Sequence, residues 1–148
     1  HPENPNTIYV AAMGHLYSDN EERGVFKTTD GGATWEKVLF VDNNTGATDL
    51  VMDLTNDDVL YAALWQRDRK AWNFEGNGTG SGMYKSTDGG TSWNQSPGSP
   101  SASVQALVID PVNPDNVYVA TRGSGVYKSP IGGDVWLWSN NGLSDLNA

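Results

Sequence analysis

The sequence predicts an all-β fold, a β-propeller segment of about three four-stranded blades. Composition is one reason, because the 148 residues include 17 glycines, six tryptophans and six tyrosines, while only 18% are charged. Such a composition suits short strands joined by tight turns better than it suits helices. The other reason is repetition. An apolar strand, a glycine-led strand and a closing tryptophan follow one another three times along the chain.

The spacing of the repeats gives their period. Equivalent tyrosines are 52 and 57 residues apart, and the closing tryptophans are 58 and 43 residues apart. The shared core is therefore about 43 residues long, and a few loops carry the additional length. A period in the forties with four short strands is typical of a propeller blade. The landmark residues are Tyr9, Tyr61 and Tyr118, and Trp35, Trp93 and Trp136.

Each blade is expected to contain four strands, a to d, counted from the central axis outward. Turns rich in Pro, Asn and Asp separate strand a from strand b. Eleven strands are expected, one fewer than three complete blades require. They are Asp49–Asp53 and Val104–Asp110 for a; Thr7–Met13, Val59–Trp65 and Asn116–Thr121 for b; Gly24–Thr28, Gly82–Ser86 and Gly125–Ser129 for c; and Thr34–Phe40, Ser92–Gln95 and Val135–Trp138 for d.

The chain is expected to form a single propeller segment. Blade 1, without its inner strand, takes residues 1–47, blade 2 takes 48–98 and blade 3 takes 99–141, and 142–148 lead into a next blade. Three blades do not close a ring, since propellers typically have four to eight. Either the remaining blades belong to a longer chain, which we favour, or copies of this chain associate to complete the ring.

Charge and composition narrow the partners and cofactors. A formal net charge of −9 disfavours phosphate backbones and anionic membranes, so no nucleic acid and no membrane insertion are expected. The absence of cysteine excludes disulfides and thiolate metal sites, and two histidines are too few for a histidine-rich metal site. No cofactor or metal is expected. Ca²⁺ near residues 19–22 or 42–44 stays open, although no known calcium-loop pattern is matched.

An eight-residue motif closes each repeat. Thr28–Trp35 (TTDGGATW) and Ser86–Trp93 (STDGGTSW) share an aspartate, a glycine pair and a tryptophan. An aspartate accepts hydrogen bonds from turn amides and glycine permits positive φ, so the motif predicts a structural turn. The third copy, Ser129–Trp136, has Ile131 and Val135 in place of the Asp and Thr/Ser. The predicted structural residues are Thr28, Asp30, Gly32, Thr34, Trp35, Ser86, Asp88, Gly90, Ser92, Trp93 and Trp136.

These motifs resemble the Asp-box of the BNR/Asp-box propellers, which include sialidases, xyloglucanases and the sortilin-type receptor ectodomain. The repeats look most like the sortilin-like or "glycosyl hydrolase BNR repeat" proteins that bacteria export, with R-G-V-F-K-T-T-D-G-G-A-T-W as the clearest phrase. The resemblance implies an extracellular or periplasmic protein. It also implies that the Asp-box lies on the c–d hairpin, away from the face that binds ligands.

The b–c loops are the variable part of the repeat and are therefore the expected binding face. They span Gly14–Arg23, Gln66–Ser81 and Arg122–Ser124. Aromatic rings can stack on a sugar or a peptide, arginines bind carboxylates, and an aspartate accepts from hydroxyl groups. The candidate ligand-binding residues are Tyr17, Arg67, Asp68, Arg69, Trp72, Phe74 and Arg122.

No catalytic residue is assigned. The resemblance to xyloglucanases implies a catalytic Asp after strand b, but the matching stretch T-R-G-S-G-V-Y has Arg122 there. The arginines also lack the sequence context that sialidases show. We therefore expect a binding or scaffold module for a glycan or a protein. The alternatives are part of a glycoside hydrolase whose catalytic residues lie partly outside this chain, and a purely structural assembly component.

Overall fold

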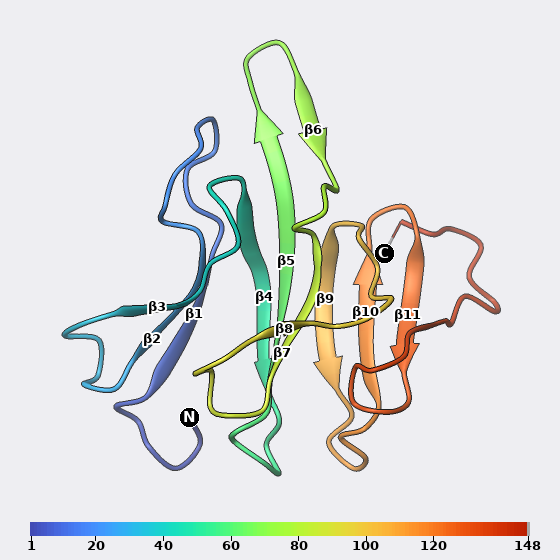
Figure 1. Cartoon of the computed structure of the whole chain (residues 1–148). Coiled ribbons are helices and arrows are strands. Elements are labelled where there is room, and N and C mark those ends of the chain that lie inside the picture. The colour runs from blue at the N-terminus through green and yellow to red at the C-terminus, as the bar shows by residue number, and fades with distance from the viewer. Residues whose placement is uncertain (148) are drawn as a thin grey trace.

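The computed structural model describes residues 1–147, and all of its regular structure is β-strand. Three antiparallel sheets stand side by side (Figure 1), and we call them blades 1, 2 and 3. Blade 1 contains β1 (Ile8–Ala12), β2 (Gly24–Thr28) and β3 (Glu36–Leu39). Blade 2 contains β4 (Thr45–Met52), β5 (Leu60–Arg69), β6 (Phe74–Gly76), β7 (Gly82–Ser86) and β8 (Asn94–Gln95). Blade 3 contains β9 (Val104–Ile109), β10 (Val117–Thr121), β11 (Gly125–Ser129) and β12 (Leu137–Trp138).

The strand order confirms the expected propeller arrangement. The sheets run β1-β2-β3, β4-β5-β7-β8 and β9-β10-β11-β12, so strands a to d are neighbours in chain order. The b–c pairing has the same register in each blade, with Ile8 opposite Thr28, Leu60 opposite Ser86 and Val117 opposite Ser129. The same short sequence pattern therefore builds the same hairpin three times.

The core lies between neighbouring blades. Leu60–Leu64 of β5 is buried throughout, because this strand has a blade on each of its two faces. Its residues alternate between the two interfaces: Tyr61 and Ala63 pack toward blade 3, while Ala62 and Leu64 pack toward blade 1. Successive side chains of a strand point to opposite faces, so a strand buried on both sides reads as a continuous apolar run.

The structure corrects the expected strands of blade 2. β4 begins at Thr45 rather than Asp49, and β5 continues to Arg69 rather than ending at Trp65. Part of the expected loop Gln66–Ser81 is instead a hairpin, in which β6 pairs with the end of β5. The described residues therefore hold twelve strands instead of eleven. This polar stretch is a strand because Arg67, Asp68 and Arg69 pair with residues 74–76.

The c–d turns, Thr28–Trp35, Ser86–Trp93 and Ser129–Trp136, lie at the opposite end of the strands from the b–c loops. In the first, the Asp30 carboxylate accepts from Thr28 Oγ1 at 2.7 Å, Thr34 N–H at 2.9 Å and Thr34 Oγ1 at 2.6 Å. These hydrogen bonds, with that of Thr34 Oγ1 foremost, lower the pKa of Asp30 to about 2. Gly32 has φ +95°, which favours glycine.

The second c–d turn repeats this geometry, and the third keeps only part of it. Asp88 accepts from Ser86 and from Ser92, and its pKa is also lowered to about 2. In the third turn Gly133 N–H still donates to Ser129 Oγ at 2.8 Å, but Ile131 provides no carboxylate. The serine and glycine alone therefore shape the last turn.

The three motif tryptophans differ in their surroundings. Trp93 Nε1 donates to Gly90 O at 3.1 Å, and Trp136 Nε1 donates to Ser96 Oγ at 3.0 Å. Trp35 is 44% exposed, which is more than expected for a side chain that anchors a hairpin. The difference follows from position, since blades 2 and 3 each have a preceding blade packed against their c–d turn.

Candidate functional site

The long b–c loops of blades 1 and 2 lie together at one end of the molecule. Figure 1 shows the β5–β6 hairpin extending beyond the other strands, with the loop between β1 and β2 rising toward the same end. Arg69 on β5 lies over the ring of Tyr17 in the blade 1 loop, with its guanidinium carbon 5.4 Å from the ring centre. A cation–π contact thus joins two of the candidate residues across the blade boundary.

One face of the hairpin carries alternating aromatic and cationic side chains. Trp65 and Phe74 pack with their ring centres 5.7 Å apart, and the Arg67 guanidinium lies 5.7 Å from the Trp65 ring centre. Arg69 is opposite Phe74 in the pairing of β5 with β6. The period of two along a strand places Trp65, Arg67 and Arg69 on this face.

A polar pocket of about 240 Å³ lies at the base of the hairpin. We call it the site pocket. Asp68 and Glu75 are directly opposite each other in the hairpin, and Lys70 Nζ is 2.8 Å from Asp68 Oδ2. The lining residues are Asn44, Gln66, Arg67, Asp68, Glu75, Gly76 and Gly78.

Two buried polar atoms of this pocket have no hydrogen-bond partner within residues 1–147. They are Arg67 Nε, a donor, and Asn44 Oδ1, an acceptor. The backbone joins the same two residues, because Arg67 N–H donates to Asn44 O at 3.0 Å. A buried donor or acceptor without a partner is uncommon in a folded protein, because leaving it unpaired costs about 1–3 kcal/mol. The site pocket therefore contains one unsatisfied donor and one unsatisfied acceptor.

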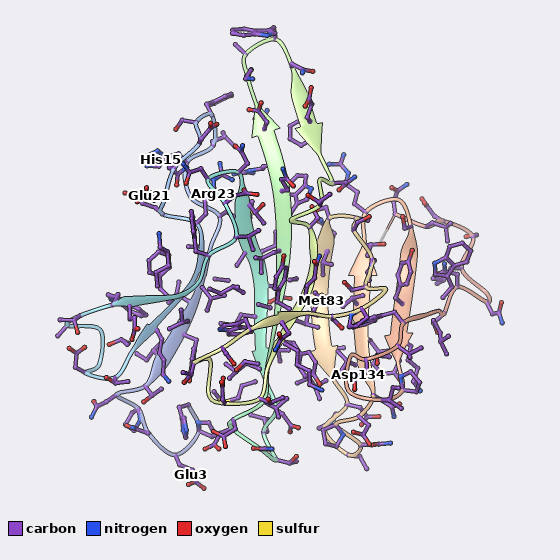
Figure 2. All side chains as sticks on the ribbon, viewed as in Figure 1. Glu3, His15, Glu21, Arg23, Met83 and Asp134 are labelled. Carbon is purple, nitrogen blue, oxygen red and sulfur yellow. The ribbon has the colours of Figure 1, made fainter. Side chains whose placement is uncertain are left out.

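Arg23 holds the blade 1 loop in place. Its side chain is only 2% exposed and donates to three carbonyl oxygens: His15 O at 3.0 Å, Ser18 O at 3.1 Å and Asn44 O at 3.2 Å. Figure 2 shows Arg23 beside His15 and Glu21 at this end of the molecule. The arginine ties the loop to the segment that enters β4, and through Asn44 O it contacts a residue that lines the site pocket.

Arginines and carboxylates are interleaved at this face, where Arg67 lines the site pocket together with Asp68 and Glu75. Burial lowers the pKa of Arg23, and the nearby Arg67 guanidinium lowers it further. Burial also lowers the pKa of Arg67, with a second contribution from Arg69. Three of the four arginines of the chain therefore act on one another at this face. Asp19 and Asp42 oppose part of this effect on Arg23, because their negative charges raise its pKa.

Two predicted residues, Trp72 and Arg122, lie farther from the site pocket than the other candidates. Trp72 lies at the tip of the hairpin and is 84% exposed. Arg122 begins the short b–c turn of blade 3, where its N–H donates to Ser103 O at 2.9 Å. Within the described chain, its side chain makes no hydrogen bond, ion pair or cation–π contact with the other six candidates. The structure thus groups the candidates of blades 1 and 2 and leaves Arg122 apart.

Several residues of the site were not among the predicted ones. Asn44 and Gln66 line the site pocket, and Arg23 donates to the carbonyl oxygen of Asn44. Arg23 directly precedes Gly24, which begins strand c, and this position indicates that its side chain lies at the end of the sheet where the b–c loops are. Asn44 follows the outer strand of blade 1 and precedes β4, and only the packing of blade 1 on blade 2 reveals its role.

The other surface features of the described residues are an apolar notch and scattered charges. An apolar notch of about 400 Å³ lies between the lower ends of β4 and β9, among residues such as Met52 and Ile109. Residues 1–147 hold no group of three or more His, Asp or Glu side chains arranged to bind a metal ion. In the same part of the chain, no helix is long and apolar enough to cross a membrane.

Comparison with known proteins gives one relative in sequence. No family model matches the chain. The chain is 31% identical over 91 residues to the chloroplastic photosystem II stability/assembly factor HCF136 of Cyanidioschyzon merolae. The match covers 60% of this chain and 20% of that protein. The chain thus spans about a fifth of the relative it matches.

Comparison of structures identifies the architecture. An ancestral GH74 enzyme superposes with a TM-score of 0.65 and 24% identity, covering 91% of this chain and 17% of the other. The GH74 enzyme of Niastella koreensis gives 0.62 and 23%, covering 89% and 19%. YCF48 bound to D1 peptide gives 0.53 and 20%, covering 76% and 32%. These similarities, together with the all-β sheets, identify the chain as part of a β-propeller.

Proposed function

We propose that the chain is a binding module that holds a polypeptide segment of a partner protein in the site pocket. The observation that carries the proposal is the pair of buried, unpartnered atoms, Arg67 Nε and Asn44 Oδ1. A peptide group supplies both missing partners, since its carbonyl accepts and its N–H donates. A carboxylate on the same segment would be attracted by Arg67 and repelled by Asp68 and Glu75, so its net effect on binding is a quantity to measure.

Two of the similarities are compatible with a polypeptide ligand, while the GH74 neighbours are equally compatible with a glycan. The sequence relative is named as an assembly factor, and one structural neighbour was solved with a peptide bound. A sugar hydroxyl also donates and accepts, so a glycan remains the outcome to test against. The aromatic residues Tyr17, Trp72 and Phe74 would pack against side chains of the bound segment.

The experiment is a binding screen on two arrays. One carries peptides with a free C-terminal carboxylate and the same peptides amidated, and the other carries neutral and acidic glycans. We expect peptide binding that Arg67→Ala weakens about tenfold or more, because it removes the buried donor and a cation. Arg122→Ala is the matched control, since it removes the same charge outside the site. Binding to glycans alone, or equal losses in both variants, would refute the proposal.

We also propose that the chain belongs to the Asp-box propellers and acts outside the cytoplasm. The support is the shared geometry of the first two c–d turns, in which Asp30 and Asp88 accept the same hydrogen bonds. Fractionation of the source cells with an antibody against this chain is the test. Recovery of the protein in the cytoplasmic fraction would refute the location.

Glycoside hydrolysis is the second candidate function. The observation that favours it is the pair Asp68 and Glu75, which are cross-strand partners and both line the site pocket. Carboxylates of cross-strand neighbours can approach the separation of about 5–5.5 Å that retaining hydrolases use. Release of reducing sugar from xyloglucan, abolished by both Asp68→Asn and Glu75→Gln, would establish this function. Peptide binding that persists in both variants without turnover would support the binding module.

A further inference from the structure

The segment that leads from β6 to β7 contains one of the two Asn-Gly pairs of the chain (Figure 1). The pairs are Asn77–Gly78 and Asn141–Gly142. In such a pair the backbone nitrogen of the glycine can attack Cγ of the asparagine, because no side chain on the second residue obstructs the approach. The first pair is also part of the candidate site, since Gly78 lines the site pocket.

The local structure favours both members of this pair. Asn77 has φ +65°, a conformation that asparagine adopts more readily than most other residues. A Cβ added at Gly78 would clash with Oε1 of Gln66, an atom that already accepts from Gly80 N–H at 2.9 Å. The backbone and the packing of the pocket therefore favour Asn followed by Gly at a place where this sequence is chemically reactive.

The groups that would react are free or activated. Trp65 Nε1 donates to Asn77 Oδ1 at 3.1 Å and so polarises the side-chain carbonyl. Within the described residues, the attacking Gly78 nitrogen and the departing Asn77 Nδ2 make no hydrogen bond. Asn77 is exposed, so water reaches it. A donor at the carbonyl oxygen stabilises the negative charge that develops there during the attack, as donors do in an oxyanion hole.

We propose that Asn77 deamidates spontaneously and that the Trp65 indole promotes the reaction. A bond forms between Gly78 N and Asn77 Cγ, and the bond from Cγ to Nδ2 breaks. The amide proton of Gly78 ends on the leaving nitrogen, which departs as ammonia and leaves a cyclic succinimide. Water then opens the ring at either carbonyl and returns a proton to the glycine nitrogen. The product is aspartate, or isoaspartate in which the main chain runs through the former side chain.

Either product changes the site pocket. Both add a negative charge beside a pocket that Asp68 and Glu75 already line. Isoaspartate also inserts a methylene group into the main chain before Gly78, which displaces the loop that Gln66 Oε1 holds through Gly80 N–H. A polypeptide with a free carboxylate should therefore bind the modified chain less well. This consequence rests on the proposed function, whereas the modification itself does not.

The test of the modification is incubation of the chain at pH 8, followed by peptide mapping with mass spectrometry at intervals. Deamidation changes the mass of a peptide by the difference between O and NH, and the two products elute separately. Asn141 is exposed, and its side chain receives no hydrogen bond among residues 1–147. We expect Asn77 to convert about two- to tenfold faster than Asn141, which is the rate that one hydrogen bond to the carbonyl can supply.

Three controls separate the hydrogen bond from the mobility of the hairpin. Trp65→Phe removes the donor, keeps a ring against Phe74, and should slow Asn77 to the rate of Asn141. Phe74→Leu loosens the same contact but keeps the indole donor, so it should not slow the reaction. If Trp65→Phe fails to fold, guanidinium chloride provides the comparison, because the two asparagines of the unmodified chain should then react at similar rates.

Two results would overturn the proposal. One is an Asn77 that stays intact while Asn141 converts. The other is an equal rate at Asn77 in the unmodified chain and in a folded Trp65→Phe variant. Neither measurement requires a ligand, so both are independent of the proposed function.

The consequence for binding is measured separately, on the peptide array. Aged chain should bind peptides with a free C-terminal carboxylate about two- to tenfold more weakly than fresh chain, and Asn77→Asp should reproduce part of this loss. Asn77→Gly is the unreactive control, since it accepts the positive φ and cannot form the ring. Its binding should not change with age. Fresh chain that binds no peptide would refute the proposed function alone, whereas unchanged binding after complete conversion would refute the effect of the modification on the pocket.

Discussion

The guanidinium of Arg69 lies over the ring of Tyr17, 5.4 Å from its centre, and connects the long b–c loops of two neighbouring blades. Arg69 comes from a strand that extends beyond its sheet, and Tyr17 from a loop without regular structure. The contact therefore sets the position of the β5–β6 hairpin above the site pocket. We therefore expect the shape of the site pocket to depend on this contact.

Arg69→Ala should loosen the hairpin without unfolding the blades. The loss of one exposed cation–π contact, about 0.5–1 kcal/mol, should raise local hydrogen exchange about two- to fivefold in residues 66–76. Hydrogen–deuterium exchange with mass spectrometry measures this. Tyr17→Ala should reproduce the effect and Arg122→Ala should not. Unchanged exchange in Arg69→Ala would show that the contact does not hold the hairpin.

Arg23→Met should destabilise the whole chain. The substitution removes three hydrogen bonds from the Arg23 guanidinium and leaves His15 O without a donor, while Asn44 O keeps Arg67 N–H and Ser18 O keeps Asn20 Nδ2. Hydrogen bonds to a charged group contribute about 1.5–3 kcal/mol each, so we expect a loss of about 3 kcal/mol or more in the free energy of unfolding. Urea denaturation provides the value. Arg69→Met, at an exposed arginine, is the control and should cost less than 1 kcal/mol.

Acid should weaken the first two c–d turns within a defined range of pH. The pKa values of Asp30 and Asp88 are lowered from 3.8 to about 2 by the hydrogen bonds they accept. A carboxylate with a lowered folded-state pKa binds protons more weakly than in the unfolded chain. Its stabilisation is therefore complete above pH of about 4 and is lost as the pH falls toward 2.

The measurement is urea denaturation of the unmodified chain and of the Asp30→Asn, Asp88→Asn double variant between pH 5 and pH 2. The difference in stability between the two should shrink steadily over the lower half of this range. Asp19→Asn provides a control, since Asp19 accepts no hydrogen bond within the part of the chain described. A difference that stays constant down to pH 2 would contradict the assigned cause.

The third c–d turn can be completed by substitution. Ile131→Asp together with Val135→Thr restores the carboxylate and hydroxyl that the first two turns contain. Both positions are exposed, and Ser129 Oγ already accepts the hydrogen bond from Gly133 N–H that the equivalent hydroxyls of the first two turns accept. We expect the melting temperature to rise by about 2–4 °C, measured by calorimetry. Ile131→Asn with Val135→Thr should gain less, because an amide oxygen is the weaker acceptor.

Local sequence patterns predicted a strand well where short motifs mark both of its ends. The three strands c were placed with their observed bounds, because a glycine begins each and the c–d turn motif ends it. The C-terminal end of β5 was not predicted, since Gln66–Arg69 is polar and a glycine-rich stretch follows. That stretch becomes a hairpin because Phe74 packs on Trp65, a contact that spans nine residues and carries no short-range pattern.

The site was predicted in part. Loop length and residue type pointed to Tyr17, Arg67, Arg69 and Phe74, which the structure brings to one face. Nothing local separated Arg122 from them, because its distance from the others depends on how blade 3 is rotated relative to blade 2. Whether the six grouped residues bind a ligand remains a prediction.

The sequence by itself determined the repeat, the order of strands and the chemistry of the c–d turns, because each depends on residues only a few positions apart. The tertiary structure alone decided which atoms remain unsatisfied. Within residues 1–147, Arg23 Nε, Arg67 Nε and Asn44 Oδ1 are buried without a hydrogen-bond partner, at the place where blade 1 packs on blade 2. The physical reason is that burial and hydrogen-bond satisfaction are properties of neighbours in space, which strands from different blades provide.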